Sequence, residues 1–409
     1  MSRARKKTGP GAVTVRMYNV GFGDSFLLTF PAADRPRRVL IDCGSHVSGP
    51  GPEPIGDVAG RIVRDVTGAD GVPRIDVVIA THRHQDHVSG FQAPVWKDVH
   101  VKEVWMPWTE DPDDPDATEI REKQSGGATK LHAALRLAGA PDHLLDLVAN
   151  CLTNEKAMTT LHEGFAGKPA RLFLPRKGAE RKAFSPASLP GVTVHPLGPS
   201  RDPDVIRDMD PPKGKGYLHL GTDRDGGSGR LPFRRRWALT PKELDATAAF
   251  AHLRLPETYR KAVDALGEDD DLAVAAALDA AVNGTSLMLI FEIGKAFLLF
   301  PGDAQWGTWN AALSDPASVA LLKKTVFCKV GHHGSHNATP KEFVQKELGA
   351  FTAMVSTRPM TAWKLIPKKA LMAALQAKSK AVVRSDRLSS VPSGFTKQGE
   401  SWVETKIPV

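Results

Sequence analysis

The stretch from residue 82 to 87 most constrains what this chain can fold into, because it holds three histidines and an aspartate within six residues. It follows directly on the apolar run at residues 77–80, so a buried strand would deliver these side chains onto one short, curved loop. On such a loop His82 and His84 can reach one metal ion, and Asp86 with His87 can reach a second. Imidazole and carboxylate ligands suit zinc, or manganese where oxygen ligands dominate. A solvated loop that happens to contain histidines is the alternative, but the H-x-H-x-D-H spacing favours a metal site.

Composition indicates an ordinary soluble protein. The chain has 409 residues, of which 41% are hydrophobic and 24% charged, and it contains no run of about eighteen apolar residues that would cross a membrane. Residues 1–12 are basic and lead into glycine and proline, which predicts a disordered tail and not a secretory signal. Cys43, Cys151 and Cys328 form no C-x-x-C pair, so we expect free thiols and a cytoplasmic location. The net charge of +8 permits a polyanionic partner without requiring one.

The order of the elements predicts an α/β fold built on sheets. Apolar and alternating runs predict strands at 13–20, 25–30, 38–42, 75–80, 191–196, 286–291, 296–300, 325–330, 353–356 and 381–384, and helices at 58–66 and 368–377. We interpret residues 13–409 as a single domain. The segments 110–190 and 201–282 have a different pattern, with helical spacing at 130–152 and a long polar stretch, so we expect mostly helical and loop insertions that form a lid or an interaction surface.

Two later strand ends also carry metal-type residues: Asp303 follows the apolar strand at 296–300, and His332 with His333 follows the strand at 325–330. Six stretches, at residues 20–25, 40–44, 81–87, 283–287, 300–304 and 329–335, together resemble the metallo-β-lactamase superfamily. The nearer resemblance is to the hydrolase-like C-terminal domain of bacterial competence DNA-uptake proteins and to soluble relatives such as phosphorylcholine esterases. It implies a four-layer αββα sandwich with two metal ions at one edge. The segment from 110 to 282 matches poorly, apart from the strand that carries His195.

The resemblance also implies a role for each site residue. His82 and His84 would hold the first metal, and Asp86 and His87 the second. Asp303 would bridge both ions, His333 would be the distal ligand of the second, and His332 would serve substrate phosphate or proton transfer, although these two histidines could exchange roles. Asp86 would also orient the nucleophile. His195 is the candidate for the family's mid-chain histidine ligand, with a plain turn histidine before Pro196 as the alternative.

These roles predict a hydrolase with two divalent ions whose metal-activated hydroxide cleaves a phosphodiester. Zinc is the favoured metal and manganese the alternative. Nucleic acid is the leading substrate. A small phosphoester, a carboxylic ester or a lactone is the alternative substrate, and a metal-stabilised scaffold or regulatory protein is the alternative of another class. Ser335 and Asn337 could donate hydrogen bonds to a phosphate, or cap a helix that begins near Pro340. Arg234, Arg235 and Arg236 could bind a phosphate backbone, although a charge run is usually a solvated face.

Overall fold

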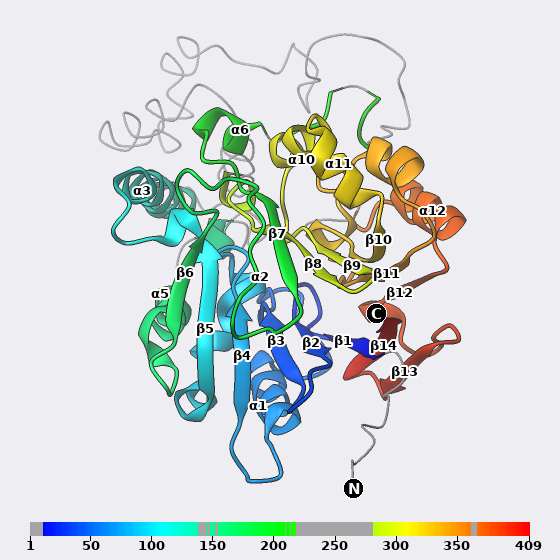
Figure 1. Ribbon diagram of the computed structural model, residues 1–409. Helices are drawn as coiled ribbons and strands as arrows, with labels where there is room; N and C mark the ends of the chain where they lie inside the picture. Colours follow the sequence, from blue (N-terminus) through cyan, green and yellow to red (C-terminus); the bar gives the residue numbers. More distant parts are fainter. Residues whose placement is uncertain are drawn as a thin grey trace, which may run out of the picture.

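The strands form two sheets in the computed structural model, which describes residues 11–137, 145, 148–151, 154–208, 210–212, 214–217, 281–360 and 366–409 (Figure 1). The first sheet has the order β13 (Phe395–Gln398), β14 (Trp402–Pro408), β1 (Ala12–Tyr18), β2 (Phe26–Phe30), β3 (Arg37–Ile41), β4 (Arg74–Ile79), β5 (His100–Pro107), β6 (Ala170–Leu174). The second has the order β12 (Ala381–Arg384), β11 (Thr352–Val355), β10 (Thr325–Lys329), β9 (Ala296–Phe300), β8 (Met288–Ile293), β7 (Thr193–Gly198).

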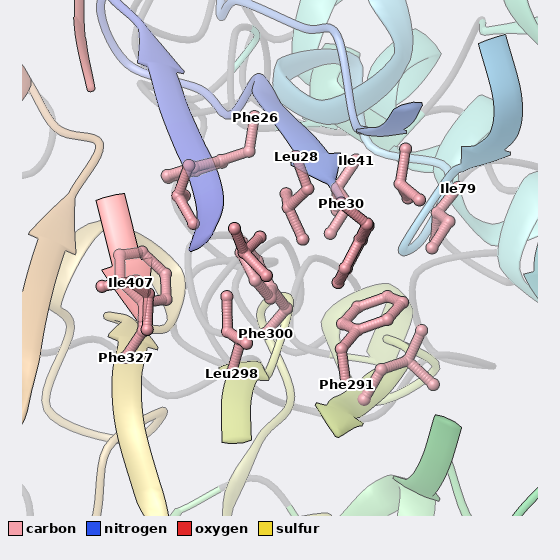
Figure 2. Packing of buried hydrophobic residues seen from close by; sticks show 14 of the residues in the cluster. Phe26, Leu28, Phe30, Ile41, Ile79, Phe291, Leu298, Phe300, Phe327 and Ile407 are labelled. Carbon is pink, nitrogen blue, oxygen red and sulfur yellow. The ribbon is translucent and has the colours of Figure 1, made fainter. Parts of the chain in front are cut away.

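The main core lies between the two sheets. Side chains alternate along a strand, so Phe26, Leu28 and Phe30 of β2 point toward the second sheet, while Leu27 belongs to the cluster on the outer face. In Figure 2 the three inward side chains face Phe291, Leu298 and Phe300 of the second sheet. These apolar strands are buried on both faces, which is why they read as nearly continuous hydrophobic runs.

Helices cover the two outer faces. On the first sheet, α1 (Ile55–Val66) buries Val58, Ile62 and Val66, which recur at the spacing of one helix face. On the second sheet lie α10 (Trp306–Leu313), α11 (Pro316–Leu322) and α12 (Lys369–Lys378). The layers are therefore helix, sheet, sheet, helix (Figure 1), and this confirms the predicted αββα sandwich.

The middle of the chain contributes more to the sheets than the sequence predicted. The segment 110–190 contains α3 (Pro115–Leu137), which begins well before the predicted helix at 130–152, and α5 (Glu155–Thr159). It also contains β6, which pairs in parallel with β5 and extends the first sheet. Of the segment 201–282, α6 (Pro203–Arg207) is described, whereas residues 218–280 and the basic tail at 1–10 lie outside the described residues. Within the described ranges, none of the helices combines the length and apolar character that a membrane crossing needs.

Parallel strands bring the site residues to one edge. The pairs β3–β4, β9–β10 and β10–β11 are all parallel, so their carboxyl ends lie together, where ligands usually bind in open sheets of this kind. The segments that follow these ends are Asp42, residues 80–87, Gly302 with Asp303, residues 330–334, and Ser356. The first two come from the first sheet and the last three from the second.

Candidate metal centre

Four buried side chains from the two sheets meet at this edge. Asp86, His87, Asp303 and His333 each offer a ligand atom, and these atoms all lie within 4.8 Å of one another. His87 Nε2 is 3.1 Å from Asp303 Oδ2, and His333 Nε2 is 3.0 Å from Asp86 Oδ2. Two imidazoles and two carboxylates form a donor set that binds divalent zinc-like ions.

The turn after β3 orients His87. Asp42 accepts hydrogen bonds from the backbone N–H and the hydroxyl of Thr81, both at 2.7 Å. Its Oδ2 also lies 2.8 Å from His87 Nδ1. Gly44 packs so closely on this loop that a Cβ there would overlap the backbone of Asp86 and His87. A carboxylate on one ring nitrogen leaves Nε2 directed at the cluster, as in metal-binding histidines.

The histidine pair after β10 sits on strained backbone. His332 and His333 have φ values of 45° and 53°, in the left-handed region that residues other than glycine seldom adopt. His333 Nδ1 lies 2.9 Å from the carbonyl oxygen of Ser356, to which it donates, so Nε2 faces Asp86. The backbone N–H of His332 donates to Asp303 Oδ1 at 3.0 Å. The strained turn thus places His333 Nε2 next to Asp86 and the His332 N–H next to Asp303, the two carboxylates of the cluster.

His82 and His84 lie beside this cluster. His82 Nε2 is 3.0 Å from His84 Nδ1, and the rings of His82 and His87 have centroids 4.1 Å apart. Burial lowers the pKa of His84 to about 4 and lowers that of His82 well below its ordinary value. Both imidazoles are therefore neutral at neutral pH, the form that binds a metal.

Charges within the cluster balance one another. Burial alone would lower the pKa of His87, but the carboxylates of Asp303, Asp86 and Asp42 outweigh it and hold that pKa well above its ordinary value. The pKa of His333 is raised in the same way, against the effect of burial, by Asp303 and Asp86. Conversely, burial would raise the pKa of Asp86, but His87 and His333 hold it well below its usual range.

Lys329 is a buried residue beside the cluster that the sequence reasoning missed. It is 2% exposed, donates to Asp303 Oδ1 at 3.0 Å and to the carbonyl oxygen of Gly302 at 2.9 Å, and forms an ion pair with Asp24. Burial would lower its pKa, yet these two aspartates raise it above the ordinary value. A lysine inside the apolar strand at 325–330 was the available signal, because a buried charge requires a partner.

The residues present fit a divalent ion. Asp86 Oδ1 is buried and has no hydrogen-bond partner among the described residues. An orphaned carboxylate oxygen is costly inside a protein unless a cation compensates it. The four-residue cluster of Asp86, His87, Asp303 and His333 could hold one ion through this oxygen and its neighbours, and the paired nitrogens of His82 and His84 could hold another.

The remaining predicted site residues lie outside the four-residue cluster, some of them next to it. His195 is not brought to the cluster: on β7, it places Nε2 2.7 Å from Glu292 Oε2. Ser335 donates its hydroxyl hydrogen to Asn337 Oδ1 at 2.9 Å, and both residues are buried just beyond the histidine pair. His332 is half-buried, and its Nδ1 has no hydrogen-bond partner in the described part of the chain. Arg234, Arg235 and Arg236 lie outside the described residues.

Comparisons with known proteins add little. No protein-family model matches the chain, and no curated protein matches it. Among solved structures, the crystal structure of Zn(2+)-bound PqqB from Methylobacterium extorquens is 11% identical, with 91% of this chain and 97% of that chain covered at a TM-score of 0.37. That similarity carries no argument about function, so the fold assignment rests on the two sheets and their helix layers.

Proposed function

We propose that this protein is a hydrolase that uses two divalent metal ions, with zinc as the favoured metal and manganese as the alternative. It cleaves phosphodiesters, and its substrate is nucleic acid. The observation that carries the proposal is the buried cluster of Asp86, His87, Asp303 and His333 with its orphaned carboxylate oxygen. The resemblance of six sequence stretches to the competence-type hydrolases supports the substrate class, and the net charge of +8 is compatible with it.

The chain's own residues divide the work. Asp86, His87 and His333 would hold one ion, His82 and His84 the other, and Asp303 both. Divalent ions, when bound, acidify water and offset the charge of a phosphodiester. Asp42 fixes the ring of His87, and the Ser356 carbonyl fixes that of His333. Among the described residues the His332 Nδ1 has no hydrogen-bond partner, and burial lowers the pKa of His332 to about 4, so a neutral imidazole is available to accept a proton.

The test is cleavage of single- and double-stranded DNA and RNA by the purified protein, stripped of metal and then reloaded with zinc or manganese. We expect cleavage by the reloaded protein and a loss of at least about a hundredfold in His87→Ala, as expected when a two-metal centre is disrupted. His195→Ala is the matched control, because this histidine pairs with Glu292 outside the cluster, and it should retain activity.

Three other outcomes would redirect the proposal. If the protein cleaves bis-p-nitrophenyl phosphate or lactones but not nucleic acid, the proposed substrate changes to a small phosphoester or a lactone. Metal binding with no hydrolysis of any of these would favour a metal-stabilised scaffold. A protein that binds no divalent ion would overturn the metal-dependent function altogether.

A further inference from the structure

We infer that the side-chain oxygen of Asn283 completes the first metal site, in the place where the family has a mid-chain histidine. The inference rests on the proposed two-metal function and assigns a ligand role to a residue of the stretch 283–287. His82 and His84 supply two nitrogens to this site and Asp303, in the proposed function, supplies one oxygen, so the side-chain oxygen of Asn283 would make this ion four-coordinate. The structure does not bring His195 to the cluster, since it pairs with Glu292.

Three donor atoms converge on the first site. His84 Nδ1 lies 3.0 Å from His82 Nε2 and 3.0 Å from Asn283 Oδ1. Ligand atoms bound to one tetrahedral zinc ion lie about 3.3 Å from each other, given bond lengths of about 2.0–2.1 Å. The observed separations are near that value. His84 Nδ1 carries at most one proton and so cannot donate to both His82 and Asn283, whereas a zinc ion accepts an electron pair from nitrogen and oxygen ligands alike.

The other nitrogen of His84 is turned away from the site. Its Nε2 lies 3.5 Å from the Sγ of Cys151, which is buried. With Nε2 against the thiol, Nδ1 is the nitrogen that faces His82 and Asn283. Metal-bound histidines commonly use one ring nitrogen for the metal and the other for a neighbour that fixes the ring.

The turn that carries Asn283 is tied to both halves of the site. The Ser286 N–H donates to the Asn283 carbonyl oxygen at 3.0 Å, and the Leu287 N–H donates to the Thr81 carbonyl oxygen at 2.8 Å. The Ser286 hydroxyl accepts from the Asp303 N–H at 3.2 Å. Asn283 itself is 1% exposed. Its side chain is therefore positioned by the same contacts that place the loop at 81–87 and the bridging Asp303.

The experiment is to measure bound zinc per chain and zinc affinity for the full-length wild type, Asn283→Ala and Asn283→His. Asn310→Ala, on helix α10 away from the cluster, is the matched control. We expect about two ions in the wild type and the control, and one tightly held ion in Asn283→Ala, with affinity at the first site at least about tenfold weaker. Asn283→His should restore the ion at the first site, and after cobalt substitution its absorption spectrum should differ from that of the wild type.

Each result decides between two propositions. If Asn283→Ala is folded by circular dichroism and still holds two ions with wild-type affinity, the amide is not a ligand and the inference is overturned, while the two-metal function stands. If Asn283→Ala does not fold, an unchanged cobalt spectrum in a folded Asn283→His overturns the inference instead. If the wild type binds no zinc, the proposed function itself fails.

Discussion

Lys329 shows at the residue scale how much this site depends on paired buried charges. Its ammonium lies between Asp24 and Asp303, and all three side chains are almost wholly buried. Burial raises the pKa of Asp24, whereas Lys329 and the neighbouring histidines outweigh burial at Asp303 and hold its pKa well below the usual range. Removal of one partner from such a group leaves an uncompensated charge in the interior.

We therefore predict that Lys329→Met lowers the free energy of unfolding of the metal-free protein by about 3–5 kcal/mol, measured by urea denaturation. Lys295→Met is the control, because Lys295 is exposed in the turn between β8 and β9, and it should change stability by less than about 0.5 kcal/mol. Addition of Asp24→Asn to Lys329→Met should recover part of the loss. Equal urea midpoints for Lys329→Met and the wild type would contradict the prediction.

Proton release should accompany metal binding. The raised pKa values of His87 and His333 favour the protonated rings in the metal-free protein, and a ligand must lose that proton. Zinc affinity should therefore rise with pH up to these raised pKa values. Calorimetric titration at pH 7 in buffers of different ionisation enthalpy should show proton release in the wild type and in His195→Ala. A binding enthalpy independent of the buffer would argue against protonated ligands.

The same shifts set the sign of the pH dependence of metal-free stability. The pKa values of His87 and His333 in the folded protein exceed the unfolded value near 6.5. Their contribution to the free energy of unfolding is therefore fully present below about pH 6.5 and is lost as pH rises through the folded pKa. His84 acts in the opposite direction. Its folded pKa of about 4 makes its contribution decline as pH falls from about 6.5 toward 4.

At the element scale, the turn after β3 is a support for the loop at 82–87. Gly44 has no positive φ, so an alanine there suffers no backbone strain, yet its Cβ would overlap the backbone of Asp86 and His87. We predict that Gly44→Ala lowers the free energy of unfolding by about 1–3 kcal/mol, the usual cost of overpacking, and reduces zinc bound per chain. In α1, Gly56→Ala meets no atom within 4 Å and should be neutral or more stable by up to about 1 kcal/mol. If Gly44→Ala and Gly56→Ala have similar free energies of unfolding and bind similar amounts of zinc, the turn after β3 can move to accommodate the added methyl group.

The elements that the sequence did not predict have a physical explanation. Strand β13 is the edge strand of the first sheet, next to β14, and it exposes most of its side chains, so its composition carries little apolar signal. Strand β5 is buried mainly toward its carboxyl end and carries Lys102 and Glu103 near its start. By contrast, β8 and β9 are almost entirely buried, and their apolar runs predicted them well.

At the scale of the whole molecule, the metal centre joins the two sheets. Asp86 and His87 follow β4 in the first sheet, whereas Asp303 and His333 follow β9 and β10 in the second. An ion held by all four can bind only when both sheets are assembled, so its binding free energy stabilises the folded state.

We predict that removal of metal with a chelator lowers the Tm and that added zinc restores it. At a free zinc concentration of about a hundred times Kd, the stabilisation should be about 2.7 kcal/mol. Asp303→Asn, which removes one of the two carboxylate charges of the cluster, should show a much smaller rise in Tm on addition of zinc. The measurement is differential scanning fluorimetry, and identical melting curves for chelated and zinc-loaded wild type would rule out a metal that links the sheets.

The sequence by itself determined an α/β fold built on sheets, most of the buried strands and the local spacing of residues 82–87, because apolar periodicity and short-range geometry are written directly in neighbouring residues. The αββα sandwich was implied by the family resemblance alone. Only the tertiary structure decided which distant side chains meet. Asp303 and His333 reach Asp86 and His87 because parallel strands of both sheets end at one edge. Lys329, Asp24 and Asn283 lie beside them through burial and pairing between distant segments, which the sequence signalled at Lys329 as a charge inside an apolar strand. His195, whose sequence context suited a ligand, instead pairs with Glu292, since strand register and not residue type decides where a side chain points.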